Sequence, residues 1–167
     1  ENLSYIKTYT YDLNGNRTGF TIIHGDETVQ SLTYEYDSLD RLISVKNGNV
    51  TEAEYTYDTN GNRASLTYAN NTYITYTYNK ANWVTNLTNS RGSYPVSSFD
   101  YTYYLSGNQR SKTDIDGKTT TYAYDGLNRL TSESDTSGLC LEYEYDSAGN
   151  RTSLTSTGSE NYTTEYV

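Results

Sequence analysis

The sequence predicts an all-β fold, an antiparallel meander of β-hairpin repeats of about 21 residues that forms a curved, spiralling open sheet. Two observations predict it. A segment of the form Tyr-x-Tyr-Asp, short turn and Arg, complete at residues 55–63, recurs along the chain, and residues beside it alternate in type as in β-strands. The seven copies start at Tyr9, Tyr34, Tyr55, Tyr76, Tyr101, Tyr122 and Tyr143, at intervals of 25, 21, 21, 25, 21 and 21 residues.

Each copy begins with a forward strand that ends at the Tyr-x-Tyr pair. Residues 74–78 alternate between Ile or Tyr and Thr, so we expect Ile and Tyr to share one face. The next residue, as in Asp58, opens a turn rich in Asn and Gly. We expect the Asp side chain to accept hydrogen bonds from turn amides. An ion pair with the Arg that follows is the alternative.

Two turn lengths occur. Asp and Arg are five positions apart at residues 12–17, 58–63 and 146–151, with Gly-Asn before the Arg. They are four positions apart at residues 37–41 and 125–129, with Leu in the middle. Both lengths fit short hairpins.

A return strand and a far turn complete each copy. Strict alternation predicts two faces, with Ala64, Leu66 and Tyr68 on one and Arg63, Ser65 and Thr67 on the other. Far turns are expected near residues 46–49, 70–71, 116–117 and 137–138. The 25-residue copies have four extra residues, which we expect in the far turns around residues 24–27 and 89–95.

The composition excludes a thick aliphatic core. Apolar residues make up 34% of the chain even with its 21 tyrosines counted, so rows of Tyr rings packed strand to strand are expected to stabilise the sheet. Stacking platforms for sugars are the alternative role of these rows. The uniform period predicts a single array over residues 1–167, cut within a repeat at both ends.

Charge and hydropathy exclude two classes of partner. A net charge of −9 with only 12 Lys and Arg residues does not fit a nucleic-acid-binding protein. The longest apolar runs, such as residues 21–23 and 139–141, are far shorter than the roughly 20 residues of a transmembrane helix. The first residues resemble no signal peptide, so we expect the chain to be part of a longer protein.

The sequence predicts no catalytic, cofactor-binding or metal-binding residues. His24 is the only histidine and is expected to be a surface turn residue. Residues 114–117 resemble the start of a calcium loop but lack its later ligands, so they are expected to form a plain turn. Cys140 has no partner for an internal disulfide, and we expect an inert, half-buried thiol on the face opposite the tyrosines.

Two further features are candidates for contacts outside the sheet. Trp83 is off the tyrosine register and stands where Arg is expected, so it is the first candidate for ligand contact. The glycosylation pattern Asn-x-Ser/Thr occurs at Asn2, Asn16, Asn49, Asn70, Asn86, Asn150 and Asn161, in a chain where such matches arise readily.

Residues 143–151 and 122–130 resemble the two alternating forms of the YD repeat of RHS (rearrangement hotspot) proteins. The resemblance covers nearly the whole chain and implies part of a large hollow β-shell. Such shells occur in bacterial polymorphic toxins, wall-associated proteins, the B and C subunits of insecticidal toxin complexes, and teneurins. The pattern is broken at Asn79, Trp83 and Tyr104. The Pro- and Gly-containing signature of the family's self-cleaving core has no counterpart, since Pro95 is the only proline, so no processing or toxin chemistry is implied.

The resemblance implies a non-catalytic structural segment of a secreted or cell-surface protein, in the wall of a shell that encloses a toxin or effector. A self-assembling fibre or adhesin, built by edge-to-edge strand addition, is one alternative. A carbohydrate-binding module is the other. The expected partners are the rest of a longer parent chain, further copies through open strand edges, toxin cargo or glycans, and no cofactor.

Overall fold

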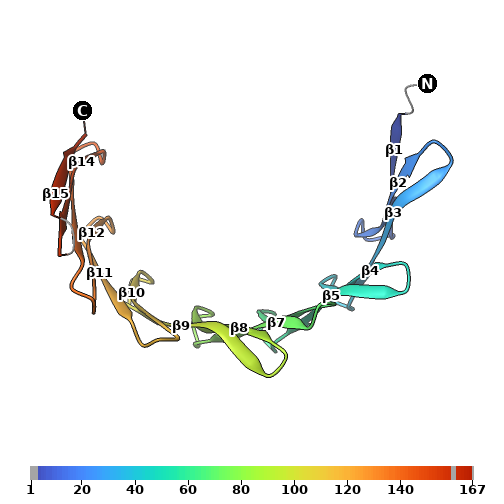
Figure 1. The fold of residues 1–167 in the computed structure, drawn as a ribbon, viewed down its shortest axis with the longest axis horizontal. Helices are drawn as coiled ribbons and strands as arrows, with labels where there is room; N and C mark the ends of the chain where they lie inside the picture. The colour runs from blue at the N-terminus through green and yellow to red at the C-terminus, as the bar shows by residue number, and fades with distance from the viewer. Residues whose placement is uncertain (1–3, 159–160, 167) are drawn as a thin grey trace. The chain divides into compact units, whose positions relative to one another are not determined.

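The computed structural model describes residues 4–158 and 161–166, and the regular structure in this part is β-strand without a helix. Fifteen strands are hydrogen-bonded in chain order in one open antiparallel sheet (Figure 1). The predicted all-β meander is therefore confirmed, whereas the curvature of the strip stays a prediction. Within these ranges no helix is long and apolar enough to cross a membrane. The glycosylation pattern at Asn2 and the predicted cut at Val167 lie outside the described residues.

The chain divides into two compact units, residues 1–76 with 89–96 and residues 77–88 with 97–167. The first unit holds β1 (Tyr5–Tyr11), β2 (Arg17–His24), β3 (Glu27–Tyr36), β4 (Leu42–Asn47), β5 (Val50–Tyr57), β6 (Arg63–Tyr68) and most of β7 (Thr72–Tyr78). The second holds most of β9 (Tyr94–Tyr103), with β10 (Gln109–Asp114), β11 (Thr119–Tyr124), β12 (Leu130–Asp135), β13 (Cys140–Tyr145), β14 (Arg151–Thr157) and β15 (Tyr162–Glu165). β8 (Val84–Arg91) contributes residues to both units.

The 25-residue copies have longer strands, not longer turns. Only Gly25 and Asp26 separate β2 from β3, whose paired residues continue to His24 and Glu27. In the other long copy, only Gly92 and Ser93 separate β8 from β9. The prediction that the extra residues enlarge the far turns is therefore wrong, because added residues that alternate can extend both strands of a hairpin and gain ladder hydrogen bonds.

One face of the sheet, called here the tyrosine face, carries the first tyrosine of each copy. In the first unit Tyr55 is paired with Leu66, and Leu66 with Ile74, so Tyr and Ile share this face as predicted. Leu66 is 5% exposed and Ala53 7% exposed, and these are the buried apolar residues of the described part. The core is thus a thin row of side chains on a single sheet.

The opposite face, called here the hydroxyl face, carries the residue between the two tyrosines. Cross-strand hydroxyl pairs recur on it, such as Thr56 with Ser65 at 2.6 Å and Thr102 with Ser111 at 2.6 Å. Such pairs stabilise neighbouring strands without an apolar layer.

A β-bulge lies beside the near turn in the first, second, third, fifth, sixth and seventh copies, and it changes the face of the residue at the arginine position. In the third copy Thr56 pairs with Ser65, but Tyr57 pairs with Arg63, so one residue of β6 is skipped. The guanidinium carbon of Arg63 lies 5.0 Å from the centre of the Tyr55 ring, on the tyrosine face. The prediction that Arg63 shares a face with Ser65 is wrong, because a bulge inserts one residue into the alternation.

Candidate functional site

The near turn is built around the aspartate, as predicted. In the third copy, one carboxylate oxygen of Asp58 accepts hydrogen bonds from the backbone amides of Asn60 and Asn62, at 2.9 and 2.8 Å. The other oxygen accepts one from the Asn62 side-chain amide at 3.1 Å. The carboxylate therefore satisfies turn amides that have no strand partner.

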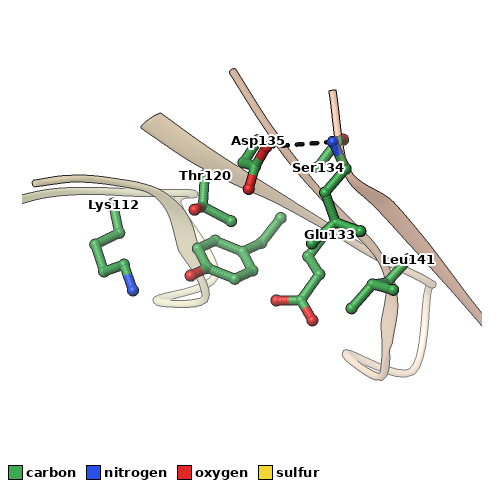
Figure 2. A pocket seen from close by; sticks show the side chains of 8 residues that line it. Lys112, Thr120, Glu133, Ser134, Asp135 and Leu141 are labelled. Atoms are coloured by element: carbon green, nitrogen blue, oxygen red, sulfur yellow. Dashed lines mark hydrogen bonds between the residues drawn. The ribbon is translucent and has the colours of Figure 1, made fainter. Parts of the chain in front are cut away.

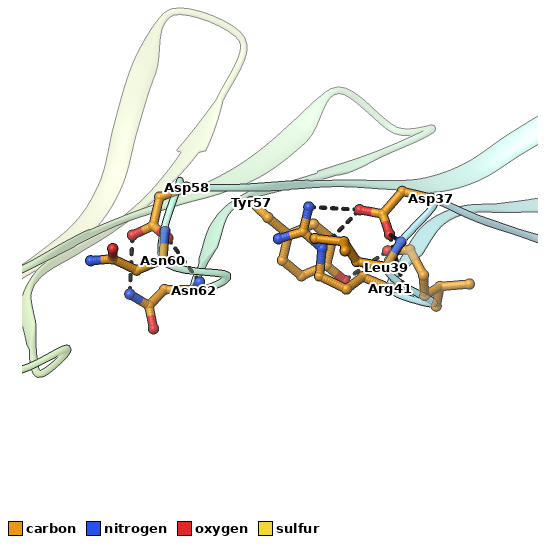
Figure 3. A network of polar contacts seen from close by, with 8 residues as sticks. Asp37, Leu39, Arg41, Tyr57, Asp58, Asn60 and Asn62 are labelled. Atoms are coloured by element: carbon orange, nitrogen blue, oxygen red, sulfur yellow. Dashed lines mark hydrogen bonds and ion pairs between the residues drawn. The ribbon is translucent and has the colours of Figure 1, made fainter.

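The shorter turn uses the arginine in place of this asparagine (Figure 3). Asp37 accepts the backbone amides of Leu39 and Arg41, at 2.9 and 3.0 Å, and its second oxygen lies 2.7 Å from Arg41 Nε and Nη2. Asp125 and Arg129 repeat this arrangement. The side-chain bond from Arg41 and the turn amides lower the pKa of Asp37. The two predicted roles of the aspartate, acceptor of turn amides and ion-pair partner of the arginine, thus coexist. The ion pair forms wherever four positions separate Asp and Arg.

The two turn lengths alternate without exception along the seven copies. The longer turns have Gly at the left-handed position, at Gly15, Gly61, Gly107 and Gly149, whereas the shorter ones have Asp40, Asn82 and Asn128 there. Asp40 and Asn128 accept bonds from the preceding longer turn. The Asn16 side-chain amide donates to Asp40 Oδ1 at 2.8 Å, and that of Asn108 donates to Asn128 Oδ1 at 2.9 Å.

The bond from a shorter turn to the longer turn that follows is of another kind. Arg129 Nη1 donates to the backbone oxygen of Asp146 at 3.1 Å. Long and short turns are therefore complementary neighbours.

The second tyrosine of the motif joins one copy to the one before. Its hydroxyl donates to the backbone oxygen of the residue that begins the preceding return strand, in the pairs Tyr36 to Arg17, Tyr57 to Leu42, Tyr103 to Val84 and Tyr145 to Leu130, at 2.6 to 2.9 Å. On the side of the next forward strand, the β4 ladder begins only at Ser44. The hydroxyl thus satisfies a carbonyl outside the ladder, where an unpaired group would reduce stability.

Arginines cover the tyrosine rings. After a shorter turn the arginine lies over the second tyrosine of the next copy, with Arg41 4.4 Å from the Tyr57 ring centre and Arg129 4.7 Å from that of Tyr145. After a longer turn it reaches a first tyrosine, as Arg151 does at 4.6 Å from Tyr143. Each such cation–π contact is worth about 0.5–1 kcal/mol at an exposed site.

Ring-to-ring packing contributes less than predicted. The first tyrosines of adjacent copies make no ring contact with one another in the described ranges. They lie on every second strand, so at about 4.8 Å per strand they are at least about 9.6 Å apart, beyond the 4.5–7 Å of aromatic pairs. Arginine, aliphatic side chains and hydroxyl bonds fill the intervals instead.

The fourth copy keeps this design with different residues. Asn79 accepts the backbone amides of Ala81 and Trp83, at 2.9 and 3.1 Å, as an aspartate would. The Trp83 ring lies 5.2 Å from that of Tyr103, where arginine lies in the second and sixth copies, and a Cβ on Gly107 would lie 3.2 Å from it. The structure gives Trp83 a packing role within the sheet, and ligand contact at this residue stays a prediction.

The fifth copy loses the aspartate anchor. The Tyr104 hydroxyl donates to the backbone oxygen of Tyr122 at 3.0 Å, and its ring meets that of Tyr124 edge to face at 6.2 Å. The backbone hydrogen bonds of the turn remain, from the Tyr104 amide to Asn108 O and from the Gly107 amide to Tyr104 O. A tyrosine here therefore contacts the next copy rather than holding its own turn.

The other candidate residues lie apart from these junctions. His24 is the last residue of β2 and stacks on Tyr5 at 4.4 Å, so it belongs to a strand rather than to a turn. Asp114 accepts the backbone amides of Asp116 and Lys118, at 3.1 and 2.9 Å, as the anchor of a far turn. Cys140 is half-buried, as predicted.

Several asparagines of the glycosylation pattern already have partners. Asn16 and Asn150 bond to turn aspartates, and Asn86 donates to Asp100 at 2.8 Å. Nothing in the sequence pattern distinguished these from the exposed Asn49.

The fold and its junctions define a segment of a YD-repeat shell. The family model of the Teneurin YD-shell matches residues 5–99, more than half of the chain, and that of the RHS Repeat matches residues 103–139 and 124–160. The chain belongs to the YD-shell family, and the predicted resemblance to RHS proteins is confirmed. No curated protein matches the chain.

Solved toxin-complex structures share the fold. The crystal structure of TcdB2-TccC3 is similar at a TM-score of 0.81 with 19% identity, over 96% of this chain and 10% of that one. The crystal structure of TcdB2-TccC3-TEV gives 0.80 with 20% identity, over the same shares. The Photorhabdus luminescens Tc holotoxin pore gives 0.78 with 19% identity, over 95% and 9%. This chain thus spans about a tenth of their length.

Proposed function

We propose that this chain is a non-catalytic segment in the wall of a β-shell that encloses a toxin or effector. The observation that supports this most directly is the use of the repeated side chains. All three repeated side chains bond within the array: the tyrosine hydroxyl and the arginine join adjacent copies, and the aspartate holds the turn of its own copy. Side chains that repeat along the chain and are used in this way suit a mechanical wall rather than a reaction.

The similarity to toxin-complex structures supports the same role. The proposed partners are the rest of a longer parent chain, continuing the sheet from its outer strands, and an enclosed polypeptide. The proposed location is outside the cell or at its surface. The net charge of −9 agrees with a partner other than nucleic acid.

Electron microscopy of the parent chain tests the proposal. Discrete hollow particles are expected, with the cargo resistant to added protease until the wall opens. A weakened wall is obtained by Tyr→Phe substitution, which removes the four hydroxyl bonds between copies. The substituted residues are Tyr36, Tyr57, Tyr103 and Tyr145. These variants should release the cargo to protease at lower urea. If protease cleaved the cargo in intact wild-type particles as fast as in the opened particles, enclosure would be contradicted.

A fibre or adhesin is the second candidate, because both outer strands are open. Every residue of β1 and of β15 is exposed, and such strands can pair with another chain. Unbranched filaments of uniform width, growing with protein concentration in light scattering, would favour this role over the shell.

A further inference from the structure

A buried serine on the hydroxyl face lies between two glutamates. Ser44 of β4 is paired with Glu35 of β3 on one side and with Glu54 of β5 on the other. Glu35 is the residue between two tyrosines, and Glu54 lies two positions before Thr56 on the same strand. All three side chains therefore belong to the hydroxyl face, and they come from two adjacent copies. The pocket on the tyrosine face of the second unit, which Glu133 and Leu141 line, is a separate feature (Figure 2).

The Ser44 hydroxyl has no partner within the described residues. Its Oγ atom is buried and makes no hydrogen bond, and the residue is only 6% exposed. A buried hydroxyl without a partner lowers stability, and such groups are rare in folded proteins. Ser153, at the same position of the seventh copy, does have a partner, because it donates to Glu144 at 3.0 Å. Ser44 thus lacks the bond that its counterpart makes.

A competing lysine explains the difference. The Lys46 ammonium lies 2.5 Å from Glu35 Oε1 and holds this carboxylate away from Ser44. In the seventh copy Thr155 stands at the position of Lys46. The Glu35 side chain is 49% exposed, so its ion pair is weak and screened by solvent ions. Glu54 makes no ion pair or hydrogen bond within the described ranges. Both carboxylates can therefore accept another cation.

The three side chains offer the oxygen ligands that calcium prefers. Calcium takes about six to eight oxygen atoms in a flexible geometry, and two bidentate carboxylates with one hydroxyl supply about five. At about 4.8 Å per strand, the two glutamates lie about 9.6 Å apart at their α-carbons, with the serine between them. No three His, Cys, Asp or Glu side chains of the described residues gather as a metal site. The buried hydroxyl is thus the third group that the two carboxylates need.

We propose that Glu35, Ser44 and Glu54 bind a calcium ion, which displaces Lys46 from Glu35. The ion joins the second and third copies on the hydroxyl face, as the Tyr57 hydroxyl joins them on the tyrosine face. Two carboxylates and one hydroxyl give a weak site, in the range of about 10⁻⁴–10⁻³ M typical of extracellular modules. Magnesium requires stricter octahedral geometry and retains its water, so it binds less tightly. This site is independent of whether the array encloses a cargo.

Thermal unfolding of the intact chain in calcium chloride tests the proposal. The ionic strength is held constant with sodium chloride, because any salt screens repulsion in a chain of net charge −9. With a dissociation constant of about 1 mM, about 10 mM calcium should raise the Tm by roughly 3–6 °C. Magnesium chloride at the same concentration should raise it by less than about 2 °C.

Ser44→Ala removes the proposed ligand together with the unpaired hydroxyl. Without calcium this variant should have the Tm of the wild type or a higher one. Its Tm should rise in calcium by only about 1 °C or less. Ser65→Ala is the matched control, because Ser65 has the same position in the third copy but is paired with Thr56 and Thr75. It should keep the full calcium shift.

Lys46→Gln provides the opposite change. It frees Glu35, so calcium affinity measured by isothermal titration calorimetry should rise about threefold, whereas Glu54→Gln should lower it. An equal rise of Tm in calcium and magnesium would overturn the proposal. A full calcium shift in Ser44→Ala would overturn it as well, and so would an affinity in Lys46→Gln that is no higher than in the wild type.

Discussion

The hydroxyl of Tyr57 offers the sharpest test of how adjacent copies are joined. Tyr57→Phe removes one atom, the donor to Leu42 O at 2.7 Å, and leaves the ring under Arg41. The Leu42 carbonyl then has no ladder partner on that side. Loss of one hydrogen bond at a part-buried site should lower the free energy of unfolding by about 0.5–1.5 kcal/mol. For a chain of this size that corresponds to a fall in Tm of roughly 2–4 °C for each 1 kcal/mol.

The same copy contains a matched control. The Tyr55 ring is covered by Arg63, but no hydrogen bond of its hydroxyl is found in the described structure. Tyr55→Phe should therefore change the free energy of unfolding by less than about 0.5 kcal/mol. Urea unfolding followed by far-ultraviolet circular dichroism measures both variants. Equal losses in the two variants would refute the role assigned to the second tyrosine.

Three further predictions concern turns and their order. Gly107 and Gly117 both have positive φ, of 92° and 83°, but only at Gly107 would a Cβ meet the Trp83 ring. Gly→Ala should therefore lower the free energy of unfolding in urea at both positions, by about 1 kcal/mol more at Gly107. Equal losses at the two positions would contradict this. Stability should fall below about pH 4, because the arginine bond lowers the folded pKa of Asp37 below its ordinary 3.8 and protonation then favours the unfolded chain. Urea midpoints that stay constant from about pH 5 to pH 2.5 would argue against this. Deletion of residues 101–121 puts two short turns side by side, whereas deletion of residues 101–142 preserves the alternation of short and long turns. The chain that lacks residues 101–121 should therefore have the lower Tm in a thermal scan, although it retains more residues.

The local parts of the fold could be predicted from sequence because their causes lie within a few residues. The turn at Asp58 needs only an acceptor, a glycine and amides that follow in order. The alternation of Tyr and Thr likewise defines a strand and its faces. The array therefore follows from the repeat period together with the strands and turn inferred for a single copy.

The parts that were missed depend on neighbouring strands. A bulge at Tyr57 reverses the face of Arg63, and no residue type marks it in a strictly alternating pattern. The bond from Tyr57 to Leu42 joins residues 15 positions apart, so it is visible only once the register is known.

In the described residues, the bonds that join copies reach from one hairpin to the next, as from Tyr145 to Leu130. Each hairpin of such a chain is therefore held by its neighbours and not by a core shared among all copies. Pulled from one end, the chain should open hairpin by hairpin at similar forces, and a break should stop at the next intact junction. Local unfolding of such an array therefore stays confined to the hairpin where it begins.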